Sequence, residues 1–183
     1  MNDTKLKTAD EVLSVVFPEG LTQDFVDPCH IANHFKIELV EDDSLSDDII
    51  GEIACEKNTA KIKINPRNNH YEPRRNFTIA HEIGHYFLHL NDNCEGFVDN
   101  KKTMNRTASF WDKKESEAND FAANLLMPVS VIIKNGKCII DNYKRENNAQ
   151  SMPKEEFIVK LSDILKVSRE SLGFRLKNLG VIK

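Results

Sequence analysis

The feature that most constrains the fold of this 183-residue chain is a helical segment at residues 73–90. Pro73 suits the first turn of a helix, and the sequence that follows, FTIAHEIGHYFLHL, carries apolar residues at helical spacing. Three ionisable side chains, His81, Glu82 and His85, interrupt this apolar pattern. Burying two histidines and a glutamate is unfavourable unless a bound group satisfies them, so we expect this helix to carry a site.

His81 and His85 stand four residues apart, so a helix places both imidazoles on one face. Together with Glu82 they form an HExxH motif, which is typical of zinc sites. A catalytic zinc takes three protein ligands and keeps one position open for water, and the glutamate can accept the proton of that water. The motif therefore predicts zinc held by the two histidines, with Glu82 as general base. An amphipathic helix with partly buried structural histidines is the alternative.

The third ligand is expected from a second strong helix at residues 113–127, which Pro128 ends. Thermolysin-like peptidases supply a glutamate from a second helix, followed four positions later by an acidic residue that hydrogen-bonds a ligand histidine. Glu115 and Asn119 stand at this spacing, one helical turn apart. We predict Glu115 as the ligand and Asn119 as the partner of a ligand histidine. Glu117 is the alternative ligand, although it is rotated off this face and is expected at the surface.

His89 follows His85 by four residues but is not predicted as a ligand. Eight residues of helix separate it from His81 by about 12 Å, which is too far for one zinc to hold all three histidines. We therefore expect His89 to be structural or to lie at the rim. His70, Tyr71 and Tyr86 are candidates for stabilising the oxyanion of the transition state, and the sequence does not choose among them.

The remaining patterns predict an α+β fold with a small zincin-like peptidase domain, built on a short antiparallel sheet, the HExxH helix and the second ligand helix. We divide the chain into a peptidase domain at 1–138, a polar linker at 139–152 and a helical subdomain at 153–183. The expected elements are helices at 8–17 and from 27 onward, a strand at 37–40, a hairpin at 49–54 and 60–64, a long polar loop at 91–112, and two helices after Pro153.

The C-terminal subdomain is similar to a helix-turn-helix, with Val167-Ser168 in the turn. Its second helix carries Arg169, Arg175 and Lys177, which are side chains that could contact DNA. The chain as a whole is acidic, with a formal net charge of −4, so we favour packing on the peptidase domain or binding of a protein partner over DNA binding.

Composition indicates a globular protein of the cytoplasm. Hydrophobic residues make up 40% of the chain, yet no stretch approaches the roughly 18 apolar residues that a membrane span needs. The polar N-terminus lacks the apolar region of a signal peptide. Four scattered cysteines without a CxxC pair are expected to be reduced thiols: Cys29, Cys55, Cys94 and Cys138.

Several of these segments together resemble the ImmA/IrrE family of zinc metallopeptidases. The resemblance covers most of residues 27–180 and rests on DPCHIANHF, the strand pair at Gly51, KIKIN, RRNFTIAHEIGHYFLHL, ESEANDFAANLLMP and LKVSRESLGFRLKNLG. It implies a fold related to the thermolysin-like proteases, with zinc on His81, His85 and Glu115 and with Glu82 as the base. Asn119 stands where the thermolysin-like enzymes commonly have an aspartate.

The resemblance also implies a biological setting. Family members resemble regulators that cleave or inactivate helix-turn-helix repressors of the XRE type, and others are paired with such proteins as toxin and antitoxin. The expected function is thus a zinc-dependent endopeptidase that cuts an XRE-type repressor at a specific site. The alternative is a metal-containing DNA-binding regulator or a toxin–antitoxin component that acts through the C-terminal helices.

Overall fold

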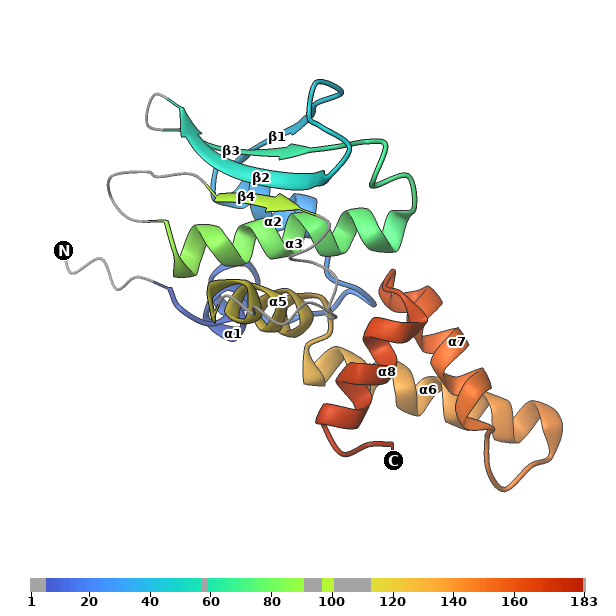
Figure 1. The fold of residues 1–183 in the computed structure, drawn as a ribbon. Helices are drawn as coiled ribbons and strands as arrows, with labels where there is room; N and C mark the ends of the chain where they lie inside the picture. Colours follow the sequence, from blue (N-terminus) through green and yellow to red (C-terminus); the bar gives the residue numbers. More distant parts are fainter. Residues whose placement is uncertain (1–5, 57–58, 91–96, 101–112, 183) are drawn as a thin grey trace.

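The computed structural model describes residues 6–56, 59–90, 97–100 and 113–182. A sheet forms the top layer, helix α3 lies beneath it, α1 and α5 lie beneath α3, and α6, α7 and α8 project to one side (Figure 1). The helices are α1 (Ala9–Val16), α2 (Pro28–His34), α3 (Glu72–Leu88), α5 (Lys113–Leu126), α6 (Val129–Asn147), α7 (Lys154–Leu165) and α8 (Arg169–Asn178). The strands are β1 (Glu38–Glu41), β2 (Ile49–Glu56), β3 (Thr59–Ile64) and β4 (Phe97–Asn100).

The sheet has four strands in the order β1-β3-β2-β4. The predicted hairpin is confirmed, since β2 and β3 pair antiparallel with Ile53 opposite Ile62. The predicted short antiparallel sheet is confirmed for the β2–β3 and β2–β4 pairs and is wrong for β1, which pairs parallel with β3. The hairpin inserts β3 between β1 and β2, and the apolar pattern of a strand does not specify its neighbour.

Strand β4 falls within the segment 91–112 that was predicted as a polar loop. It pairs antiparallel with β2 at the edge of the sheet, with Phe97 opposite Ile53. Backbone hydrogen bonds make this pairing, so a short polar segment can form it without a strong apolar pattern. The rest of the predicted loop, 91–96 and 101–112, lies outside the described residues.

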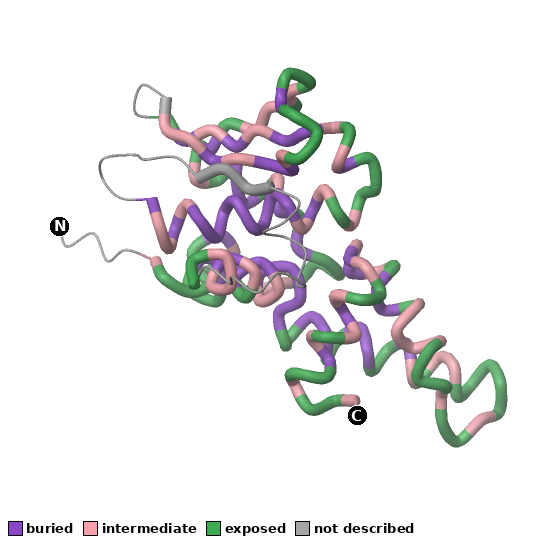
Figure 2. Tube along the Cα trace, in the orientation of Figure 1, coloured by how far each residue is buried: buried purple, intermediate pink, exposed green. Residues whose placement is uncertain are grey.

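Helix α3 is the central element of the core. It packs on β2 and β3 through one side and on α5 through another. Ile79 and Ile83 are fully buried in the same hydrophobic cluster as Ile53 and Ile62 of the sheet and Leu125 of α5. The buried stretches of the chain follow α3 and the strand faces above it (Figure 2). Contacts on both sides explain why residues 78–85 of α3 are all buried.

Residues 139–147 of the predicted linker at 139–152 are helical and continue α6. The division of the chain into a peptidase domain, a linker and a helical subdomain stays a prediction. Val131, Asn135, Gly136 and Ile139 are buried at helical spacing, and the polar side chains that suggested a linker lie on the exposed face. Within the described part of the chain, no single helix is long and apolar enough to cross a membrane. Helices α5 and α6 pass that length and composition test only together, as a pair bent by 46°.

The two helices predicted in the tail are present, and their role as a helix-turn-helix stays a prediction. Lys166 takes a left-handed conformation after α7, and the Ser168 hydroxyl caps α8 by accepting a hydrogen bond from the Ser171 amide. Apolar side chains of both helices are fully buried between them: Leu161, Leu165, Leu172 and Leu176. Three polar contacts among the described residues join these helices to the peptidase layers. Asn76 donates to the Lys166 carbonyl, the Lys166 ammonium pairs with Glu72 at 3.4 Å, and Arg175 donates to the Met127 carbonyl.

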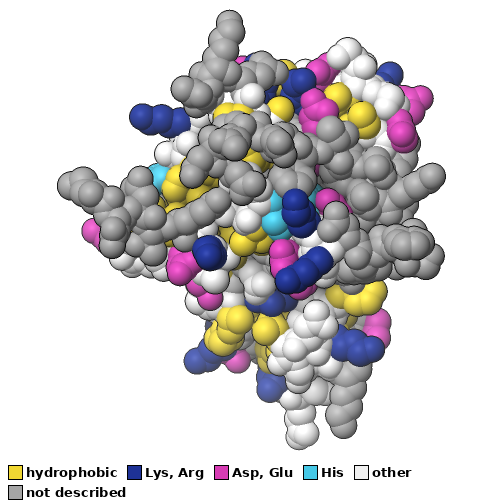
Figure 3. All heavy atoms as spheres, turned by 60° about the vertical axis from the view of Figure 1, so that its left-hand side comes forward, with side chains coloured by type: hydrophobic (Ala, Val, Ile, Leu, Met, Phe, Trp, Pro, Cys, Tyr) yellow, Lys and Arg dark blue, Asp and Glu magenta, His cyan; other side chains and the backbone are white. Residues whose placement is uncertain are grey.

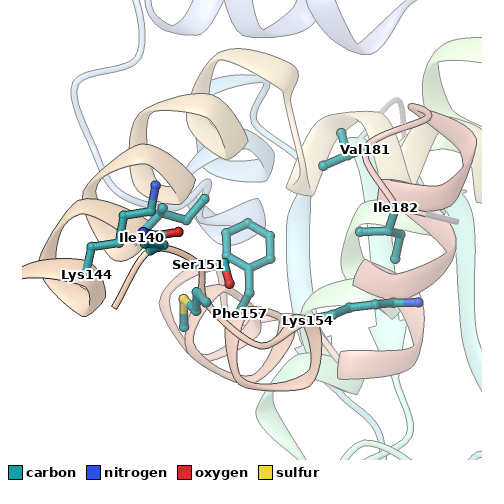
Figure 4. Close-up of a pocket in the computed structure, with 9 residues that line it drawn as sticks. Ile140, Lys144, Ser151, Lys154, Phe157, Val181 and Ile182 are labelled. Atoms are coloured by element: carbon teal, nitrogen blue, oxygen red, sulfur yellow. The ribbon is translucent and has the colours of Figure 1, made fainter. Parts of the chain in front are cut away.

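A cavity of about 340 Å³ lies in this C-terminal part, bounded by α6, α7 and the last described residues (Figure 4). Ile140, Phe157 and Ile182 provide apolar walls, and Lys144 and Lys154 are also among the lining residues. Its lining residues include none of the residues predicted to bind metal.

The cysteines differ from expectation at one position. Cys29 and Cys138 carry free thiols, as predicted, whereas Cys55 is disulfide-bonded. Cys94 lies outside the described residues. The prediction that every cysteine is reduced is therefore wrong at Cys55, because spacing along the chain does not report which cysteines approach one another in space.

Candidate metal centre

Helix α3 delivers the HExxH residues into the interior. Pro73 occupies its first turn, and the helix then runs unbroken for 17 residues to Leu88. His81, Glu82 and His85 all have a relative exposure of 0%. Three ionisable side chains on one helix are thus withdrawn from solvent at the same place, which requires compensating interactions.

The two imidazoles meet the carboxylate of Glu115, which α5 supplies. The Nε2 atoms of His81 and His85 lie 3.0 Å apart. Glu115 Oε2 is 3.3 Å from His81 Nε2, and Glu115 Oε1 is 3.3 Å from His85 Nε2. The structure therefore brings together the three residues predicted as metal ligands, each offering a ligand atom within 4.8 Å of the others.

These positions fit a metal ion. Two bonds of about 2.0–2.1 Å at a tetrahedral angle place their ligand atoms about 3.4 Å apart, close to the three separations of 3.0, 3.3 and 3.3 Å. Glu115 Oε2 is buried and accepts no well-formed hydrogen bond among the described residues, even at 3.3 Å from His81. Two neutral imidazoles and one carboxylate are a donor set that suits zinc.

Gly84 allows the second ligand helix to approach. A Cβ atom at this position would lie 3.2 Å from both the Cα and the carbonyl oxygen of Ala118, and 3.3 Å from the Cβ of Phe121. The small residues therefore bring the backbones of α3 and α5 close together at the level of the motif. Since Glu115 lies one turn before Ala118 on α5, this approach sets the reach of its carboxylate.

Gly51 of β2 lies against the other flank of the motif. A Cβ atom here would meet the Thr78 methyl at 2.8 Å and Glu82 Oε1 at 3.2 Å. The Glu82 carboxylate thus occupies space that only a glycine on β2 leaves open. Thr78 is held in turn by Asn69, whose side-chain oxygen accepts from the Thr78 hydroxyl at 2.7 Å.

Both ligand histidines have partners on their outer nitrogens. His81 Nδ1 lies 3.1 Å from Asn119 Oδ1, as the spacing of Glu115 and Asn119 predicted. His85 Nδ1 lies 2.9 Å from His89 Nδ1, and His89 Nε2 lies 3.0 Å from Glu117 Oε2. Outer partners of this kind orient a metal ligand and fix which nitrogen carries the proton.

The contact between Glu117 and His89 was not predicted from the sequence. His89 was expected to be structural or to lie at the rim. His89 terminates α3, and its side chain turns back toward His85, with 5% of it exposed. Glu117 is 43% exposed, which agrees with the surface position predicted, yet it also contacts His89. The spacing of His85 and His89 was a usable signal, because residues four apart on a helix are neighbours.

The pKa shifts of Glu115 and His85 agree with two histidines gathered around one carboxylate. Burial opposes ionisation of Glu115, but the interactions with His81 and His85 outweigh it and lower its pKa to about 2. Burial also lowers the pKa of His85, and the nearby Glu115 only partly offsets this. A neutral His85 and an ionised Glu115 are the protonation states that metal ligands need.

The candidates for the oxyanion partner lie at different distances along α3. Tyr71 is the N-cap residue, ten residues before His81, and His70 precedes it, so both start about 15 Å away along the axis. Tyr86 follows the motif directly and is partly buried, with its ring 4.9 Å from that of Phe87. Of the three, Tyr86 lies nearest to the motif along the chain.

The sequence of the chain matches a known protein family. The model of Peptidase_M78, described as the IrrE N-terminal-like domain, matches residues 32–177, which is most of the chain. The chain belongs to this peptidase family. The match includes both helices that supply the metal cluster, and it confirms the ImmA/IrrE resemblance.

One curated relative supports the assignment. The chain is 32% identical over 117 residues to "Uncharacterized immunity region protein 2" of Bacillus phage phi105. This alignment covers 63% of the chain and 68% of the phage protein. A peptidase family and a cluster able to bind a metal ion therefore meet in one molecule.

Proposed function

We propose that the protein is a zinc-dependent endopeptidase in which His81, His85 and Glu115 hold the metal and Glu82 is the general base. The observation that carries the proposal is the convergence of three ligand atoms within 4.8 Å, from two helices, in a chain of a peptidase family. A helix with merely structural histidines does not require a buried carboxylate from a second helix between them.

Zinc bound by these three residues would acidify a coordinated water and polarise the substrate carbonyl. The protein contributes the base, since the Glu82 carboxylate sits on the same helix as both histidines and is excluded from bulk solvent. Glu82 takes the proton of the attacking water and returns it to the leaving amine. An amide oxygen can only accept, so the Asn119 contact would place the proton of a neutral His81 on Nδ1 and leave its Nε2 lone pair available to a metal.

The substrate we propose is a protein regulator, namely a helix-turn-helix repressor of the XRE type, cut at a specific site in the cytoplasm. The ImmA/IrrE resemblance supports this choice, and so does similarity to a protein of a phage immunity region. A general protease in the cytoplasm would damage the cell, so docking must restrict access.

Incubation of the protein with zinc, a helix-turn-helix repressor of the XRE type, and casein tests this proposal. Mass spectrometry should find one major cut in the repressor and almost none in casein. A metal chelator should abolish the cut, and added zinc should restore it. Rapid digestion of casein with the repressor left intact would overturn the proposed substrate, and a cut that survives the chelator would overturn the proposed mechanism.

DNA binding through α8 is the second candidate function, and the structure reduces the number of α8 cations that are available for it. Arg169 and Lys177 are exposed, whereas Arg175 donates from Nε to the Met127 carbonyl at 3.2 Å. One of the three cations predicted to reach DNA is thus used to hold α8 on the body. Among the described residues of the face in Figure 3, charges of both signs are interspersed and form no continuous basic surface.

A further inference from the structure

The outer nitrogens of the two ligand histidines are supported unequally. His81 contacts a neutral amide, Asn119, at 3.1 Å. His85 contacts a second histidine at 2.9 Å, and this histidine contacts a carboxylate at 3.0 Å. In these contacts between described residues, the His85 side connects to a negative charge through consecutive hydrogen bonds, whereas the His81 contact is to a neutral amide.

Metal binding by His85 would determine which ring nitrogens of His85 and His89 carry a proton. If His85 offers the lone pair of Nε2 to a metal, its proton must lie on Nδ1. That Nδ1–H group then donates to His89 Nδ1, which must be unprotonated to accept. The remaining proton of His89 lies on Nε2 and is donated to Glu117 Oε2. One set of neutral tautomers satisfies both contacts.

We propose that His89 and Glu117 are positioning residues, which hold His85 in its metal-binding tautomer and orientation. The inference rests on the metal site of the proposed function and adds two residues to it. Glu117 orients His89, and His89 accepts the Nδ1–H of His85, which makes His85 a better electron donor to the metal. Asn119 performs the orienting task for His81 without a charge.

The position of His89 supports this role over simple packing. It is the residue that ends α3, so its backbone leaves the helical path and its side chain can turn back toward His85. Its side chain is 5% exposed, while Glu117 reaches it from α5 with 43% of its own side chain exposed. Glu117 also pairs with exposed Lys113 at 3.5 Å, an interaction that a matched control must reproduce.

Glu156 of α7 supplies that control. It pairs with Lys160 at 3.3 Å, also four residues apart on one helix but with the glutamate first, and it has a similar exposure of 41%. The experiment measures zinc affinity by competition with a chelator for the wild type, His89→Ala, Glu117→Gln and Glu156→Gln. His89→Ala should weaken zinc binding about 10–100-fold. Glu117→Gln should weaken it less, because an amide oxygen still accepts, and Glu156→Gln should leave it unchanged.

A spectroscopic measurement separates positioning from a structural defect. In the zinc-loaded wild type, NMR of ¹⁵N-labelled histidine should show a His85 Nδ1 proton that is protected from exchange. Glu117→Gln, on an exposed face, should keep the fold and shift this resonance, so the test stands even if His89→Ala fails to fold. Unchanged zinc affinity and an unchanged His85 resonance in Glu117→Gln would overturn the inference. A wild type that binds no zinc would instead overturn the proposed function together with it.

Discussion

The α3–α5 layer and the α6–α8 part use polar residues in opposite ways. Between α3 and α5, His81, Glu82 and His85 are fully buried, both histidines contact the Glu115 carboxylate, and the two helices approach to the limit that Gly84 allows. In α6–α8 the buried residues are chiefly apolar, and cations such as Arg169 and Lys177 remain exposed. Burying an ionisable group is unfavourable unless a ligand or a partner compensates for the lost hydration. Among the described residues, the fully buried ionisable groups lie in the first region. This difference locates the chemistry at α3–α5.

The largest expected effect is that of Glu82→Gln on the first region. The variant should retain zinc and its fold, because Glu82 is not among the three convergent ligands. Cleavage of the repressor should fall by about 10²–10⁴-fold, since the proton acceptor is lost. Single-turnover cleavage measures this effect. Normal cleavage by Glu82→Gln would remove the general base from the account.

Next in size is the loss of the third ligand. Glu115→Ala should weaken zinc binding by more than the about 10–100-fold expected for loss of an outer partner, because its carboxylate lies 3.3 Å from both histidines. Glu117→Ala should have a smaller effect, since it acts through His89. Calorimetric titration with zinc compares the two. The opposite order would make Glu117 the ligand.

A pair of glycine substitutions tests the packing difference directly. Gly84→Ala should destabilise the protein by about 1–3 kcal/mol through overpacking, because its new methyl group would meet Ala118 at 3.2 Å. Gly173→Ala in α8 has nothing within 4 Å and should stabilise the protein by up to about 1 kcal/mol through helix propensity. Urea unfolding of both variants gives these free energies. Equal effects at the two positions would contradict the tight approach of α3 and α5.

The smallest expected effect separates two arginines of α8. Arg175→Ala should cost about 0.5–1.5 kcal/mol of stability, because it removes the hydrogen bond to the Met127 carbonyl. Arg169→Ala should change stability little, since this side chain is exposed. Thermal unfolding compares them, with DNA mobility shifts at several salt concentrations run in parallel. Salt-dependent DNA binding that Arg169→Ala abolishes would favour the DNA-binding alternative.

The sequence predicted the elements well where one local pattern sufficed. The HExxH helix, the second ligand helix and the hairpin follow from periodicity and from Pro73 and Pro128. It failed where the answer depends on a partner distant in the chain, as in the parallel pairing of β1 with β3 and the disulfide at Cys55. Periodicity describes which face is apolar and does not say what covers it.

The site residues were likewise predicted where a local spacing sufficed and missed where a distant packing contact decided their position. The i,i+4 spacing placed His81 and His85 together, and the spacing of Glu115 and Asn119 predicted which residues of α5 would face them. The contact of Glu117 with His89 was missed, because it depends on how α5 is rotated against the end of α3. That rotation is set by close contacts such as Gly84 with Ala118, which no local pattern encodes.

The central claim is that the α3–α5 cluster is a metal site, and zinc content tests it most directly. Elemental analysis of the purified protein should find about one zinc per chain, as three convergent ligands imply. The His81→Ala/His85→Ala double variant should contain almost none, whereas the Arg169→Ala/Lys177→Ala double variant should keep the full amount. Full zinc occupancy without His81 and His85 would contradict the assignment.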